Sequence, residues 1–100
     1  MKLFFTPNAI RRLTQIEDYE RKKGRAGKGK KKVREIRDRA KMLEDNPKLG
    51  PKEEYLEELG QGHRSLLVGT LYKIIYLIKA PVIFITDIFD VRQDPDKMKP

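Results

Sequence analysis

Two segments in the first half of the chain place apolar residues three and four positions apart. This spacing lines up one face of a helix and predicts two amphipathic helices, over residues 7–22 and about 30–45. Thr6-Pro7 suits the start of the first helix, because threonine caps helices and proline needs no partner in the first turn. Asn46-Pro47 ends the second, since a residue before proline avoids helical geometry. The apolar positions are Ala9, Leu13, Ile16 and Tyr19, then Val33, Ile36, Ala40 and Leu43.

The second half of the chain and its first few residues contain short apolar runs rich in β-branched and aromatic residues. These runs predict strands over residues 2–5, 64–68, 71–78 and 82–90, joined in part by tight turns. An acidic stretch at residues 55–59 is a further candidate strand, near an edge. Residues 71–78 are apolar on both faces except at Lys73, which predicts a central strand covered by helices.

Together these elements predict a single α+β domain over residues 1–100, in the order β-α-α-β-β-β(-β). Short links make the last strands antiparallel, and the apolar stripe of each helix needs a surface to cover it. The expected fold is a two-layer sandwich, with a helical hairpin packed on a mainly antiparallel sheet. Three glycines within residues 24–29 predict a flexible interhelical loop at about 23–30. Residues 92–100 form a short polar tail.

Positive charge is concentrated in the first half of the chain. The net charge is +8, and residues 1–50 carry 16 Lys and Arg against 7 Asp and Glu, whereas residues 51–100 carry 7 against 8. Residues 21–34 hold nine basic residues and no acidic one. Such a block is either a solvated loop or a surface for phosphate or an acidic partner. The candidate nucleic-acid contacts are Arg25, Lys28, Lys30, Lys31 and Lys32.

Composition narrows the chemistry available to the chain. Without cysteine there is no disulfide scaffold, iron–sulfur cluster or cysteine nucleophile, and a single histidine argues against a multi-histidine metal site. The glycine spacing in residues 24–30 does not match a phosphate-binding loop. We therefore expect no cofactor, no metal and no small-molecule substrate. Apolar runs are too short for a membrane span and no signal peptide is evident, so a cytoplasmic location is expected.

An ordered set of short motifs resembles the RelE/ParE superfamily of bacterial toxins. Arg64 opens one strand, Lys73 and Tyr76 occupy an R-x-x-Y position with Lys for Arg, and Asn46-Pro47-x-x-Gly50 follows the second helix. The last strand runs into the polar tail at residues 92–95. The resemblance covers nearly the whole chain. It implies the toxin of a type II toxin–antitoxin module, neutralised by a cognate antitoxin that is often acidic.

The resemblance leaves two branches with different chemistry. RelE-like members cleave messenger RNA on the ribosome, for which Arg64 and Lys73 could stabilise phosphate charge. Asp90 stands where an RNase member of the superfamily would carry a histidine, however, and no tyrosine follows Tyr76, so the RNase set is incomplete. The tail favours the ParE-like branch, which poisons DNA gyrase by binding rather than by catalysis. A non-toxic, protein-binding member of the superfamily is a further alternative.

Four residues are the candidate contacts to the target or the antitoxin: Arg64, Lys73, Arg92 and Gln93. Arg64 has a structural alternative, an ion pair with Asp87 or Asp90 across the sheet. Lys73 interrupts an apolar strand and must reach water or a partner, so it is expected in a groove. Tyr72 and Tyr76 face the opposite side, into the core. The single histidine, His63, is expected at the surface.

Overall fold

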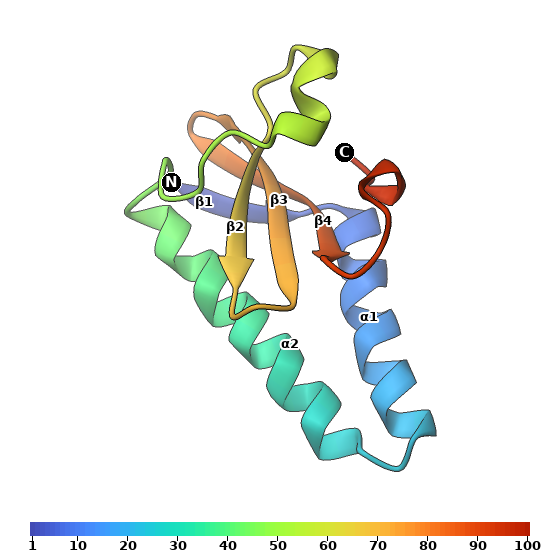
Figure 1. Ribbon diagram of the computed structural model, residues 1–100. Coiled ribbons are helices and arrows are strands. Elements are labelled where there is room, and N and C mark those ends of the chain that lie inside the picture. Colours follow the sequence, from blue (N-terminus) through green and yellow to red (C-terminus); the bar gives the residue numbers. More distant parts are fainter.

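The computed structural model describes residues 1–100 and contains two helices and four strands (Figure 1). Their order follows the sequence pattern: β1 (Lys2–Phe5), α1 (Pro7–Lys22), α2 (Ala26–Lys41), β2 (Arg64–Val68), β3 (Tyr72–Lys79) and β4 (Val82–Asp90). Three short 3-10 helices complete the chain: η1 (Met42–Glu44), η2 (Glu54–Leu59) and η3 (Pro95–Lys97).

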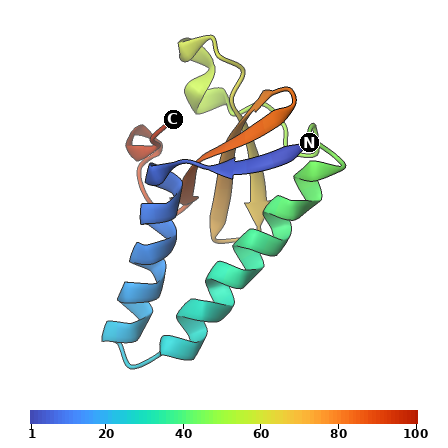
Figure 2. The same cartoon turned by 180° about the vertical axis from the view of Figure 1, so that it is seen from behind.

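The strands form one sheet in the order β1-β4-β3-β2, and the two helices cover one of its faces (Figure 2). β2, β3 and β4 are successive antiparallel neighbours, whereas β1 pairs parallel with β4. β3 and β4 are therefore the central strands. The predicted α+β, two-layer architecture is confirmed, and the sheet is mixed only at β1.

Each face of the sheet buries a different cluster. On the helix face, side chains of all four strands pack with the apolar stripes of α1 and α2, and Tyr72, Ile74 and Tyr76 of β3 are all buried there. On the opposite face, η2 and η3 cover a smaller cluster of Leu56, Ile75, Phe89 and Met98. Because β3 is covered on both sides, it is apolar on both sides.

The interhelical connection is shorter than the sequence pattern predicts. α2 begins at Ala26 rather than near residue 30, so only residues 23–25 link the helices, and the expected flexible loop at 23–30 is wrong. Gly29 lies against α1: a Cβ on it would stand 3.0 Å from Cβ of Glu20. The glycine thus permits close helix–helix approach, a packing reason that a loop prediction cannot register.

A buried carboxylate holds the end of this helical hairpin together. The Glu20 side chain is 2% exposed and accepts hydrogen bonds from Arg25 Nε at 2.8 Å and Lys32 Nζ at 3.3 Å. Arg25 and Lys32 lower the pKa of Glu20 from 4.5 to about 2, against the opposing effect of burial. Two cations of the basic block are therefore structural.

Residues 55–59 form part of η2 rather than the predicted edge strand. The Glu53 side chain caps this 3-10 helix by accepting the Tyr55 N–H at 3.1 Å, and Gly60, with φ of 66°, ends it. The turn carries Leu56 onto Ile75 of the sheet. Leu56 is the one buried residue of η2. The segment therefore does not need the alternating apolar residues of a strand.

The loop between α2 and β2 is fastened by Tyr76. Its hydroxyl donates to Pro47 O at 2.7 Å and accepts the Gly50 N–H at 3.0 Å. A Cβ on Gly50 would stand only 2.3 Å from Ser65 O, so only glycine fits this crossing. The Asn46-Pro47-x-x-Gly50 motif and Tyr76 are thus two halves of one buried structural contact.

Replacing Tyr76 with phenylalanine removes that hydroxyl while keeping the ring. We expect Tyr76→Phe to lower the free energy of unfolding by about 1–3 kcal/mol, because the buried Gly50 N–H then lacks an acceptor. Urea denaturation measures the change. Tyr55→Phe, at an exposed hydroxyl, is the control, and equal losses for the two variants would contradict the assigned contact.

The Glu20 cluster predicts an acid-dependent stability. Since the folded-state pKa of Glu20 lies near 2 and the ordinary value is 4.5, the stabilisation is complete above pH 4.5 and is lost as the pH falls toward 2. Glu20→Gln should therefore be less stable than the parent at pH 7, and the difference should shrink between pH 4.5 and 2. Thermal unfolding across this range tests the prediction. Glu35→Gln, exposed on α2, should show no such convergence.

Candidate functional site

A groove between α1 and the end of β4 contains the two tail residues that the sequence nominates. Arg92 and Gln93 line it with residues of both helices, β3 and β4, and its volume is about 460 Å³. Its floor is apolar, from Ile16, Tyr72 and Ile88, and its rim is charged. We call it the α1–β4 groove.

Arg92 is held at the rim of this groove by its neighbour Asp90. Nε and Nη2 of Arg92 lie 3.0 and 2.7 Å from the two carboxylate oxygens, and the Arg92 N–H donates to the same group. Hydrogen bonding to Arg92 lowers the pKa of Asp90 below its ordinary value. The Arg92 side chain is still 68% exposed, so its remaining donors face solvent. It can therefore bind an anionic partner without first breaking a buried contact.

Next to Arg12 of the groove, the fully buried Asp87 joins three parts of the chain. Its carboxylate accepts hydrogen bonds from Arg12 Nε at 3.1 Å, Asn8 Nδ2 at 3.2 Å and the Lys99 N–H at 2.8 Å. α1 and the C-terminal end of the chain are thereby fixed on β4, and Arg12, one of these donors, also lines the groove. The polar residue inside the apolar run at 82–90 was the sequence signal for it.

Arg64 does not make the ion pair that the sequence suggests. Asp87 binds Arg12 and Asp90 binds Arg92, so the expected pairing of Arg64 with either carboxylate is wrong. Nη1 of Arg64 instead donates to Gly50 O at 2.8 Å. Arg64 thus has a structural contact, as one of the two sequence interpretations expected. Its partner, however, is the backbone carbonyl of Gly50, in the loop that Tyr76 also holds.

Lys73 projects from the other face of the sheet, where it meets a carboxylate. Its Nζ lies 2.8 Å from Glu53 Oε1 and 6.0 Å from the centre of the Tyr55 ring. Burial raises the pKa of the Glu53 carboxyl, whereas the hydrogen bonds from Lys73 and from the Tyr55 N–H lower it. The net effect is a pKa below the ordinary value. A shallow pocket of about 480 Å³ borders the pair. Sequence reasoning missed Glu53, because its role depends on where the loop before η2 lies.

The structure separates the four candidate contacts. Arg92 and Gln93 share one groove. Arg64 pairs with Tyr76 in the β2–β3 register and lies on the helix face, whereas Lys73 pairs with Leu67 and lies on the opposite face. Arg64 and Lys73 are therefore not brought together at one position.

The candidate nucleic-acid contacts also divide into two groups. Arg25 and Lys32 are bound to Glu20. Lys28, Lys30 and Lys31 are exposed, and no carboxylate lies within ion-pair distance of them. These three lysines retain their charge for a partner.

His63 is buried, contrary to the expectation of a surface position. It is 3% exposed and neither imidazole nitrogen has a hydrogen-bond partner. Burial, with a smaller contribution from the charge of Lys79, lowers its pKa. The backbone carbonyl of His63 accepts a hydrogen bond from the Glu53 N–H at 2.9 Å. This bond holds His63 against the start of the loop that contains η2.

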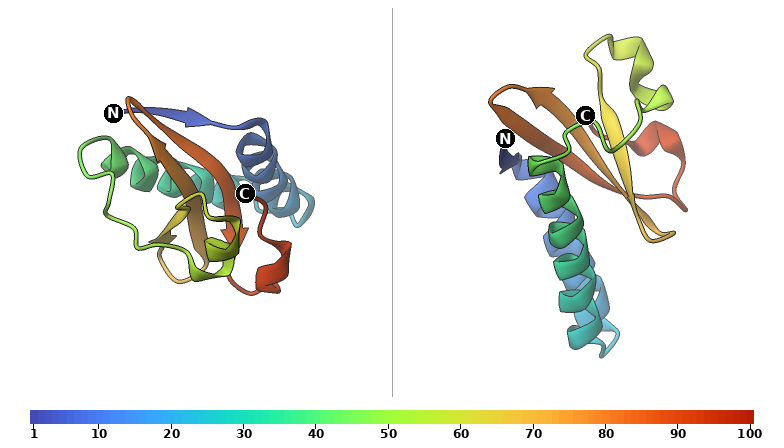
Figure 3. Two further views of the ribbon diagram at one scale, coloured as in Figure 1. Left: turned by 90° about the horizontal axis from the view of Figure 1, so that it is seen from above. Right: turned by 90° about the vertical axis from the view of Figure 1, so that its left-hand side faces the viewer.

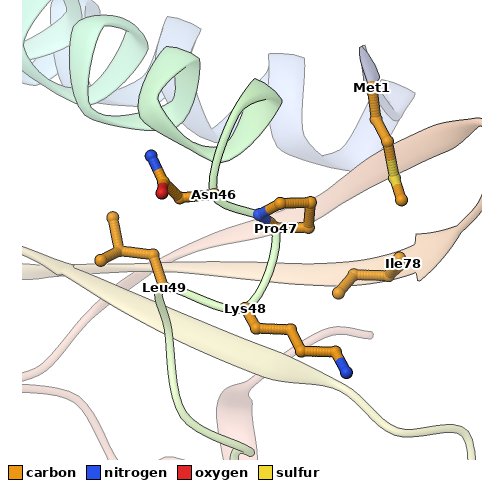
Figure 4. Close-up of a pocket in the computed structure, with 6 residues that line it drawn as sticks. All are labelled: Met1, Asn46, Pro47, Lys48, Leu49 and Ile78. Atoms are coloured by element: carbon orange, nitrogen blue, oxygen red, sulfur yellow. The ribbon is translucent and has the colours of Figure 1, made fainter.

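Other features add no further chemistry. A shallow pocket of about 480 Å³ lies between the start of the chain, the 46–49 loop and β3, and Lys48 is its one charged side chain (Figure 4). No three His, Cys, Asp or Glu side chains cluster closely enough to hold a metal ion. Neither α-helix is both long and apolar enough to span a bilayer.

Comparison with known proteins identifies the family. A helical hairpin on a mixed four-stranded sheet is an α+β fold of the RelE/ParE type. Residues 3–95 match the family described as the ParE toxin of type II toxin–antitoxin system, parDE, and the chain belongs to that family. It is thus the toxin component of such a system, and its partner is the cognate ParD antitoxin.

A solved structure supports the fold. The chain superposes on a chain of a chromosomal ParDE toxin–antitoxin system from P. aeruginosa with a TM-score of 0.75, over 90% of this chain and 95% of that one. The two sequences are 23% identical, so this likeness bears on the fold alone. No curated protein matches the chain.

The Lys73–Glu53 pair predicts a loss of stability when the lysine is removed. Lys73→Met leaves the Glu53 carboxylate, 2% exposed, without its cation, so we expect the free energy of unfolding to fall by about 1–3 kcal/mol. Denaturant unfolding at pH 7 measures it. Lys79→Met, exposed at the end of the same strand, is the matched control. A loss no larger than that of the control would contradict a structural role for Lys73.

Proposed function

We propose that this toxin arrests growth by binding DNA gyrase and poisoning it, without cleaving a nucleic acid itself. Membership of the ParE family carries the proposal, since the match extends over residues 3–95. Such a target implies a cytoplasmic site of action.

The arrangement of the cations favours binding over RNA cleavage. Cleavage beside a 2′-hydroxyl needs a base, an acid and cations that converge on one phosphate. Arg64 and Lys73, the two cations nominated for that role, lie on opposite faces of the sheet. Each also has a partner within the protein, Gly50 O for Arg64 and Glu53 for Lys73. A toxin that acts by binding needs no such convergence.

The α1–β4 groove is the surface that we assign to the target and the antitoxin. Its apolar floor offers buried contact area, and Arg92 at its rim, whose side chain is 68% exposed, offers positive charge to a partner. An extended acidic segment would fit this combination, and the net charge of +8 would favour its approach. Arg92 and Gln93 would make the polar contacts at the rim. In this proposal Lys73 and Arg64 serve the fold.

The test is inhibition of gyrase supercoiling by purified, antitoxin-free toxin. The parent should inhibit supercoiling and stabilise cleaved DNA. Arg92→Ala/Gln93→Ala should need about tenfold more protein for the same inhibition, as expected for the loss of one charge-assisted hydrogen bond of about 1.5 kcal/mol. Lys97→Ala, exposed on the same tail, should leave the inhibition unchanged.

Pulse labelling after induction distinguishes the outcomes in cells. Thymidine incorporation should fall before amino-acid incorporation if gyrase is the target. Protein synthesis failing first, together with unaffected supercoiling at large molar excess of toxin, would overturn the proposal and favour messenger RNA cleavage on the ribosome. Normal growth on induction would instead favour a non-toxic binding protein.

A further inference from the structure

The end of the helical hairpin projects beyond the sheet and is strongly basic. α1 and α2 continue past the edge of the sheet to the 23–25 link, as Figures 1 and 3 show from different sides. α2 contains eight basic and two acidic residues. Neither the proposed gyrase contact nor the proposed antitoxin contact at Arg92 and Gln93 accounts for this concentration of charge.

Only part of this charge is satisfied within the protein. Glu20 binds Arg25 and Lys32, and Asp18 binds Arg21 at 2.7 Å. The remaining cations of residues 21–34 make no ion pair and are exposed: Lys22, Lys23, Lys28, Lys30, Lys31 and Arg34. The structure therefore leaves a patch of uncompensated charge on a rigid element.

Four exposed cations form a row along one flank of α2, beside its buried stripe. Lys30, Arg34, Arg37 and Lys41 follow one another at intervals of four, three and four residues, and all are exposed. These intervals place them on one face of the helix, and the row is about 16 Å long at 1.5 Å per residue. We call it the α2 row. Lys31 lies directly beside its first member.

The surroundings of the α2 row point to a phosphate backbone rather than a peptide. A protein partner of useful affinity normally buries aromatic or aliphatic anchors. The exposed large apolar side chains of this protein all lie outside α2. Met42, which directly follows Lys41, is exposed, and its sulfur already accepts a hydrogen bond from Arg39 Nη1 at 3.3 Å. Regular positive charge with one apolar side chain at its end suits a polyanion recognised by charge alone.

The absence of aromatic residues on α2 further separates duplex from single strand. Single-stranded binding surfaces interleave cations with aromatic rings on which bases stack. α2 has no aromatic residue. Two rings lie against cations of the hairpin, which already pair with them: Phe5 lies under Arg37 Cζ at 5.0 Å, and Tyr19 of α1 lies under Lys23 Nζ at 5.7 Å. A duplex, with its bases already stacked, offers phosphate without requiring such rings.

We propose that the α2 row and Lys31 bind the phosphate backbone of duplex DNA, without reading its sequence. Arg25 and Lys32 take no part, because they neutralise Glu20. The contact is independent of gyrase and goes beyond the proposed function, since it requires only the toxin and DNA.

Fluorescence anisotropy with a labelled 20-base-pair duplex tests the proposal, using the purified full-length toxin at several salt concentrations. Lys30→Gln/Lys31→Gln/Arg34→Gln removes three exposed charges, and we expect affinity to fall at least about tenfold. The slope of log affinity against log salt should become shallower by about 2–3, at 0.9 per phosphate contact. Thermal unfolding verifies that the variant is folded.

Lys2→Gln/Lys48→Gln/Lys97→Gln is the matched control, because it removes the same charge from exposed positions outside the hairpin. It should retain affinity within about threefold and keep most of the salt slope. An equal loss in the two triple variants would overturn the α2 row as the contact, and net charge alone would then account for binding. Failure of the parent to bind the duplex would also overturn it.

Two competitors distinguish the other polyanions. Single-stranded DNA or RNA of the same length should bind less tightly than the duplex, and tighter binding would overturn the assignment to duplex. Poly-glutamate at the same concentration of charge should displace the duplex poorly. Displacement equal to that by unlabelled duplex would overturn the proposal and identify the row as a surface for acidic protein. None of these readouts contains gyrase, so they and the supercoiling test can fail separately.

Discussion

The buried carboxylate of Asp87 organises the molecule around its central strand. An ionised group without solvent is costly unless it is paired and hydrogen-bonded. Asp87 meets this requirement with donors from the start of α1 and from the last residues of the chain, which are 75 and 12 positions away from it. The first helix and the tail are consequently held against β4 together. Arg12, one of these donors, also lines the α1–β4 groove.

The same requirement divides the basic residues of the chain into two populations. The chain carries 23 Lys and Arg, and three deeply buried carboxylates, Glu20, Glu53 and Asp87, each bind at least one of them. The cations so used hold the hairpin, η2 and α1 in place. Most of the others are exposed, and α2 carries six of these exposed cations: Lys28, Lys30, Lys31, Arg34, Arg37 and Lys41. Net charge alone does not describe this protein, since cations bound to a buried acid and unpaired cations alternate within one helical hairpin.

Periodicity predicted most of the fold because burial here follows simple geometry. The apolar stripe of α1, with Ala9 and Leu13, is buried against the sheet. The strand β3, apolar on both faces, is buried at the centre of that sheet. The failures occurred where a distant contact decides local structure. Gly29 reads as flexible until α1 lies against it, and η2 depends on a cap from Glu53. His63 reads as polar surface until a loop covers it.

The candidate site was predictable in part for the same reason. Arg92 and Gln93 were nominated from the resemblance of the tail to ParE-like members, and the structure brings both to one groove. Lys73 was correctly read as needing a partner, but its partner is Glu53, in a loop whose course the sequence pattern does not reveal. Arg64 was placed on a strand correctly, yet its contact is a backbone carbonyl, and no side-chain pattern encodes such an acceptor.

The difference between a loop and a helix changes what the basic block can do. In a mobile loop, binding a polyanion would require ordering each side chain and the backbone beneath it, at about 1–2 kcal/mol per residue. In this structure Gly29 allows α2 to begin early, and Glu20 fixes its first turns through Arg25 and Lys32. The backbone of α2 is therefore already ordered in the folded protein, and binding a polyanion loses no further backbone entropy. Arg25 and Lys32 thus hold the helix on which the α2 row lies. Because the row is already ordered before a polyanion binds, its affinity is higher than that of a mobile loop with the same contacts.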